Sequence, residues 1–139
     1  MKRAVFIVVL CAALALPSGL SAVSLGPTTP RAAILYQAKL FRQGKFRVKY
    51  MTTYTANFRT RCPYARYVAD QRYGRRIMGP RFTLRDVRVR LQTPTRALLA
   101  YRYVSGNGRW VVAVTFKDGD VYVKQGRFWF DEHDRVTHC

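Results

Sequence analysis

The sequence predicts a single α+β domain in which N-terminal helices precede and pack against an antiparallel sheet. As far as Pro80 the apolar residues recur at helical spacing, and beyond it they alternate with a period of two. Of the 139 residues, 49% are hydrophobic and 14% aromatic, and the chain holds only 9 Gly and 6 Pro. This composition excludes collagen-like and unfolded chains, and no internal repeat or linker divides the sequence.

Residues 1–22 are expected to be a cleaved signal peptide. A positively charged start, an apolar run over 4–16 and small residues at the exit of that run occur together. The run of 13 residues is shorter than the roughly 20 needed to cross a bilayer, which makes a membrane anchor the weaker alternative. Residues 23–28 then form a short linker and 29–139 form the domain. The protein is therefore expected to be secreted or periplasmic.

Three helices are expected before Pro80. The first begins at Thr29-Pro30, an N-cap followed by the proline favoured at the first helical position, and ends at Gly44. The third begins near Pro63 and ends at Gly74, or at the latest at Gly79-Pro80. The second lies between them and carries aromatic residues at an unbroken i, i+4 interval, a pattern typical of a core-facing stripe. That stripe consists of Phe46, Tyr50, Tyr54 and Phe58.

The rest of the chain is expected to form an antiparallel meander. One residue near Arg85-Asp86 is extra to the alternation, as in a β-bulge, and this directs Arg88 and Arg90 away from the core. Asp118-Gly119 is the strongest hairpin signal. The expected segments are strands from Phe82 to Leu91, over 97–104, over 110–116 and over 121–130 with a kink at Gly126, then a turn at 131–134 and a short strand ending at Cys139.

Cys62 and Cys139 are expected to form a disulfide. Cys11 lies in the signal peptide, and an even number of cysteines in an oxidising compartment favours pairing. A reactive thiol is one alternative, since arginines flank Cys62, but the end of a chain is a poor place to hold a catalytic group. A metal site is another, but His133 and His138 have no second cluster at ligand spacing. We expect neither a metal nor a cofactor.

Four stretches carry a resemblance to a known family: 43–46 (QGKF), 58–63 (FRTRCP), 97–104 (ALLAYRYV) and 128–131 (FWFD). With their order along the chain they resemble the nuclear transport factor 2-like superfamily, and most closely its small secreted bacterial members. The resemblance implies a cystatin-like cone, in which a curved antiparallel sheet wraps around the helices. It also implies that a cysteine after the second helix pairs with one at the end of the last strand.

The superfamily includes transport adaptors, ketosteroid isomerases, polyketide cyclases and dehydratases, so its fold does not define an activity. Neither Asp70 nor Asp86 is well placed as a base inside a cone, and His138 on a terminal strand is an ordinary edge residue. The other acids, and His133, are expected in solvated turns: Asp118, Asp120, Asp131, Glu132 and Asp134. The sequence therefore favours a non-catalytic binding domain. The alternative is a small isomerase- or cyclase-like enzyme that uses an acid, a histidine or a tyrosine of the cone.

Two binding surfaces are expected, for a small apolar ligand, a protein or an anionic envelope component. Residues 23–109 hold 19 basic and 2 acidic side chains, against 4 and 5 in 110–139. Arginines that merely keep the protein soluble are the alternative to a binding site, and export disfavours nucleic acid. The expected apolar pocket is lined by Tyr50, Tyr54, Phe58, Trp110, Val112, Val114 and Phe116. The expected site for anionic lipid or envelope polymer consists of Arg72, Arg75, Arg76, Arg88 and Arg90.

Overall fold

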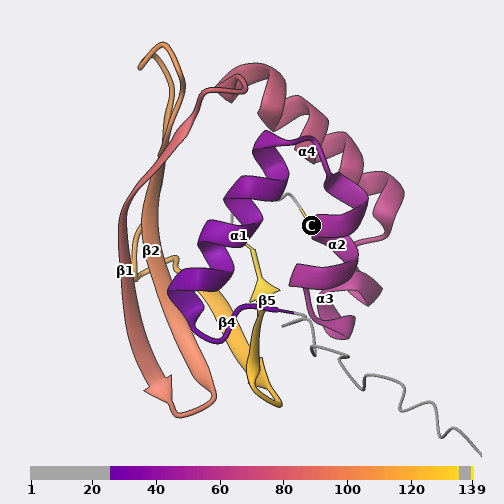
Figure 1. The fold of residues 1–139 in the computed structure, drawn as a ribbon, viewed down its shortest axis with the longest axis vertical. Coiled ribbons are helices and arrows are strands. Elements are labelled where there is room, and N and C mark those ends of the chain that lie inside the picture. Colours follow the sequence, from indigo (N-terminus) through magenta and orange to yellow (C-terminus); the bar gives the residue numbers. More distant parts are fainter. Residues whose placement is uncertain (1–25, 135–138) are drawn as a thin grey trace, which may run out of the picture.

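The computed structural model describes residues 26–134 and 139 and confirms the α+β class. In this part of the chain four helices precede five strands, and the helices lie against one face of a curved antiparallel sheet (Figure 1). The helices are α1 (Pro30–Arg42), α2 (Phe46–Thr53), α3 (Ala56–Arg61) and α4 (Tyr64–Met78). The strands are β1 (Thr83–Thr93), β2 (Arg96–Val104), β3 (Val111–Val114), β4 (Asp120–Gln125) and β5 (Phe128–His133).

Helix α1 begins and ends where the sequence predicts. The Thr29 side chain accepts a hydrogen bond from the backbone N–H of Ala32 at 3.1 Å, and Pro30 is the first helical residue. Gly44 follows the helix with φ of 67°, a conformation that favours glycine. Ala33 and Ile34 are buried against β2, in the same apolar cluster as Leu99. This packing fixes α1 against the sheet.

The aromatic stripe is not one helix, as the sequence predicted, but two. Tyr54 is extended, with ψ of 150°, and forms an isolated parallel bridge with Asp131 of β5. The next backbone N–H, of Thr55, donates to the Asp131 carbonyl at 3.0 Å, and the Thr55 hydroxyl caps α3 by accepting from the N–H of Phe58. The helical chain is therefore interrupted because its backbone joins the sheet. Tyr54 and Phe58 still stack, with ring centroids 4.2 Å apart.

Helix α4 passes through Gly74 and ends at Gly79, which has φ of 73°. Gly74 therefore does not end the helix. A Cβ added at this position would lie 3.7 Å from Cζ of Phe41, an ordinary contact distance.

The sheet has the order β1-β2-β4-β5, and β3 also pairs with β2. The predicted bulge is present, with a register shift between Arg85 and Arg88 and φ of 55° at Asp86. The hairpin predicted at Asp118-Gly119 is wrong, because β3 and β4 do not pair with each other. Both run antiparallel to β2 along the same edge, and 115–119 leaves that edge between them.

Two further expectations for the end of the sheet are corrected. The predicted strand 121–130 is a hairpin of β4 and β5, with Gln125 opposite Phe128 and φ of 62° at Gly126, as in a type II′ turn. Asp131 lies within β5 and not in a turn. The short strand expected before Cys139 falls on 135–138, outside the described residues, as does the proposed signal peptide.

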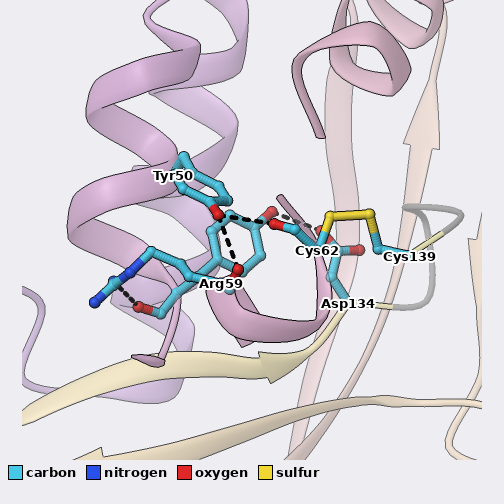
Figure 2. The surroundings of a disulfide bond; sticks show 6 residues. Tyr50, Arg59, Cys62, Asp134 and Cys139 are labelled. Carbon is cyan, nitrogen blue, oxygen red and sulfur yellow. Dashed lines mark hydrogen bonds between the residues drawn. A yellow bond between two sulfur atoms is a disulfide. The ribbon is translucent and has the colours of Figure 1, made fainter. Parts of the chain in front are cut away.

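The predicted disulfide is present. Cys62 and Cys139 are joined, with Cα atoms 5.3 Å apart and a sequence separation of 77 (Figure 2). Cys62 is fully buried, and its carbonyl accepts a hydrogen bond from the Tyr50 hydroxyl at 2.7 Å. The same hydroxyl lies 3.1 Å from the Arg59 carbonyl. The bond therefore anchors the end of the chain to the aromatic side of the helical layer. Among the described residues, no helix is long and apolar enough to span a bilayer.

We predict that Cys139→Ser lowers the urea midpoint of unfolding, because the disulfide no longer restricts the unfolded chain. The loop-closure model gives about 4 kcal/mol as an upper value. Reductant should move the midpoint of the native chain to that of the variant and leave the variant unchanged. Two alkylatable thiols at these positions in the purified native protein, under non-reducing conditions, would contradict the prediction.

Candidate functional site

A cluster of buried polar side chains lies where the helices meet the sheet. Its charged members are Lys49 from α2, Asp120 from β4, Asp131 from β5 and Asp134 just after it, none more than 7% exposed. The sequence predicted that these three acids occupy solvated turns, and that prediction is wrong. Asp120 on β4 and Asp131 on β5 are buried on strands that face the helices. Asp134 follows directly after β5 and is buried as well.

The three carboxylates lie close together and are held by hydrogen bonds from other elements. One oxygen of each lies within 4.8 Å of the others. The Tyr101 hydroxyl donates to Asp120, and the Tyr54 hydroxyl donates to Asp134 at 2.6 Å. The remaining acid, Asp131, accepts from another side chain through Oδ2, whereas its Oδ1 has no hydrogen-bond partner among the described residues.

Gln37 of α1 is the centre of this network. Its Nε2 donates to Asp131 Oδ2 at 3.3 Å and to the Thr53 hydroxyl at 3.2 Å. Its Oε1 accepts from the Tyr122 hydroxyl at 2.8 Å. One buried amide thus connects α1 to α2, β4 and β5, and it satisfies polar groups that would be costly to bury alone.

Burial governs the protonation of the cluster. It raises the pKa of Asp131 well above its usual range, and the neighbouring Asp134 and Asp120 raise it further. Burial also raises the pKa of Tyr54 and of Tyr101, so both hydroxyls remain protonated donors. The surroundings of Asp131 therefore favour its protonated form.

Lys49 is the buried base of the site. Its Nζ donates to Gln71 Oε1 of α4 at 2.8 Å. It lies 5.4, 5.6 and 5.9 Å from the ring centroids of Phe41, Tyr54 and Tyr67. Burial lowers the pKa of Lys49, and the acids Asp134, Asp131 and Asp120 oppose that effect only in part.

A partly open cavity of about 180 Å³ adjoins the cluster between α4 and the sheet. This volume corresponds to about six water molecules and is close to the ~150 Å³ of an apolar protein cavity that binds benzene. Its polar side is formed by Gln37, Lys49, Asp70, Gln71, Tyr101 and Asp134. Its other side is formed by Phe41, Tyr73, Gly74, Ile77, Met78, Phe82, Tyr103 and Val112.

The predicted pocket residues occupy different places. Val112 lines the cavity, whereas Val114 belongs to the core beside α1. Trp110 is 56% exposed. Phe116 lies outside β3, with the guanidinium of Arg90 over its ring at 4.3 Å. The helical stripe of Tyr50, Tyr54 and Phe58 packs against Tyr67 in a cluster of its own.

The five predicted anion-binding arginines form two groups. The first group lies on α4 and consists of Arg72, Arg75 and Arg76. These arginines border an open cleft that is also lined by Phe46 of α2 and by Pro80. Arg88 and Arg90 lie on β1, and both guanidinium groups lie over the ring of Phe116. Their strand partners are Ala100 and Leu98, on the face opposite that of Leu99, so they point away from the core as predicted. Anion binding by the α4 group stays a prediction.

Asp70 and Asp86, the two acids considered above as candidate bases, lie outside the buried cluster of three carboxyls. Asp70 is half-buried and lines the cavity from α4. Asp86 is exposed at the bulge and pairs with Arg102 at 3.3 Å. His133 ends β5 on the surface, and His138 falls outside the described residues.

Three carboxylates in one place are a ligand set for hard cations such as Mg²⁺ or Ca²⁺. Each acid already accepts a hydrogen bond from a tyrosine or amide donor, so these donors hold the cluster without a cation. The geometry therefore does not by itself assign a metal.

Sequence reasoning missed Lys49 and Asp131, although both carry a signal. Lys49 follows Phe46 by three residues and precedes Thr53 by four, which places it on the buried face of α2. Asp131 is two residues after the buried Trp129, on the same face of β5. A charged residue in phase with buried neighbours is thus the pattern that indicates the site.

No protein-family model matches this chain, and no curated protein matches it.

We predict that the native chain loses stability relative to Asp131→Asn as the pH rises from about 4 into the neutral range. The folded protein favours protonated Asp131, so its contribution is complete below the ordinary pKa of 3.8 and is lost through the raised pKa. Each pH unit between the two values is worth about 1.4 kcal/mol. Urea unfolding at several pH values measures this, with Asp118→Asn at an exposed position as the control. A difference that does not vary with pH would contradict the assignment.

Proposed function

We propose that this chain is an exported protein that binds a small, largely apolar molecule carrying one polar group. The observation that carries the proposal is the cavity, in which apolar walls from Met78, Phe82 and Val112 face buried hydrogen-bonding groups around Lys49. Ligand sites commonly combine mostly apolar walls with a few fixed polar groups. The volume of about 180 Å³ suits a molecule of about one ring.

The polar side defines the chemistry of the ligand. Lys49 and Gln71 are linked to each other there, and Asp134 is held by Tyr54, so the polar atoms have fixed positions before a ligand arrives. A ligand with a carbonyl or hydroxyl group exchanges hydrogen bonds with them. A wholly apolar molecule offers no acceptor for the N–H groups of Lys49 that do not bond to Gln71, so it should bind more weakly.

Export is part of the proposal. It rests on the charged start, apolar run and small-residue exit of 1–22, and on the Cys62–Cys139 disulfide. Disulfides persist in oxidising compartments and are rare in the cytosol. Membership of the nuclear transport factor 2-like superfamily would agree with both the export and the interior pocket.

Acid–base catalysis on the bound molecule, of the isomerase or cyclase kind, is the second candidate. It is favoured by the presence of a base, Lys49, and an acid, Asp134, on the wall of one cavity. Burial lowers the pKa of Lys49 and raises that of the adjacent Asp131, the direction in which catalytic groups are tuned towards neutral pH.

We predict that phenol binds the native chain and that Gly74→Leu abolishes this binding, because a leucine at this helical position projects into the cavity beside Phe41. Gly74→Ala is the matched control. It meets Phe41 only at ordinary contact distance, should keep binding, and should gain up to about 1 kcal/mol of helix stability. Amide chemical-shift changes around the cavity measure binding. Unchanged spectra of the native chain, or binding that persists in Gly74→Leu, would contradict the proposal.

A further inference from the structure

We propose that Lys49 is a nucleophile that forms an imine with a small aldehyde or ketone in the cavity. The inference rests on the proposed function, because it requires a small molecule to bind there, and it names the class of that molecule. Two observations support the proposal: Lys49 lines the cavity, and the buried cluster of Asp120, Asp131 and Asp134 adjoins the same cavity.

The amine is placed so that the cavity is its route to a reactant. Lys49 lines the cavity, yet the residue is only 5% exposed to solvent. Gln71 lines the cavity as well and accepts a hydrogen bond from Nζ at 2.8 Å, which holds the amine between two lining residues. Phe41, Tyr54 and Tyr67 surround the amine with aromatic rings and keep bulk water from it. An aldehyde or ketone in the cavity therefore meets Nζ at close range.

The surroundings also favour the reactive form of the amine. A lysine attacks a carbonyl only when it is neutral, and desolvation in an apolar pocket is one of the ways in which proteins achieve this. Burial is the largest influence on Lys49, and it lowers the pKa of the amine. Exposed lysines such as Lys45 lack this environment.

The reaction needs an acid as well as an amine, and the cluster supplies one. The Nζ lone pair attacks the carbonyl carbon, the C=O π electrons move to oxygen, and a proton passes from nitrogen to that oxygen. The carbinolamine then accepts a proton from the Asp131–Asp134 group and loses water, and the second N–H proton returns to the carboxylate. Amine and carbonyl thus give imine and water, with no oxidant or reductant.

Asp134 is the group that contacts the reactant, because it lines the cavity, and Asp131 stands behind it within the same cluster. The Tyr54 hydroxyl donates to Asp134 at 2.6 Å and holds its carboxyl in place. Burial and the two neighbouring carboxyls favour the protonated form of Asp131, and dehydration of the carbinolamine requires such a proton donor.

The test is reductive trapping. The native chain is incubated at neutral pH with benzaldehyde or cyclohexanone and cyanoborohydride, and the modified lysines are located by peptide mass mapping. Lys49 should be alkylated at least about ten-fold faster than the exposed lysines of the part of the chain that the structure describes, which are Lys39, Lys45, Lys117 and Lys124. Lys49→Met should lose the fast adduct, and Lys45→Met should keep it.

Two outcomes overturn the proposal in distinguishable ways. If phenol binds in the cavity but Lys49 reacts no faster than the surface lysines, imine formation is refuted and the binding function stands. If phenol does not bind either, the binding function itself fails. Because the comparison is made within the native chain, it remains decisive even where Lys49→Met does not fold.

Discussion

The burial of four ionisable side chains at one point is the constraint on which the rest of this structure depends. Removing such a group from water costs several kcal/mol in its charged form unless other groups replace its hydration. Here the replacement comes from separate elements: Gln37 on α1, Gln71 on α4 and Tyr101 on β2. Each of these elements must therefore keep its place for the cluster to remain satisfied, and the polar network connects the helical layer to the sheet.

The break in the aromatic stripe follows from the same constraint. Had the helix continued through Tyr54, its backbone could not join β5 beside Asp131, and the Tyr54 hydroxyl would not reach Asp134. The short helix α3 then carries Cys62 to the disulfide, which closes the chain next to this region (Figure 2). A stable core would not need buried charges, since apolar residues of similar volume often serve as well or better. Their presence next to a cavity is what favours function.

Local chemistry made much of the fold predictable. Thr29-Pro30 begins a helix through its own cap, and the extra residue at Asp86 breaks the alternation of its strand, so neighbouring residues were sufficient for both. Tyr54 and Asp118-Gly119 could not be assigned in this way, because distant strands decide their conformations. Asp131 appeared to be a turn residue for the same reason: its burial depends on pairing with β4 and on contact with α1.

The central claim is that Lys49 is a desolvated amine facing a ligand cavity and not a structural cation of the acid cluster. The most direct measurement is an NMR titration of the lysine Cε and Nζ resonances in the native chain, with the Lys49 signals assigned by Lys49→Arg. We predict that Lys49 loses its proton below the ordinary lysine pKa of 10.5, because burial outweighs the attraction of the three acids. Titration of Lys49 at or above that ordinary value would contradict the claim.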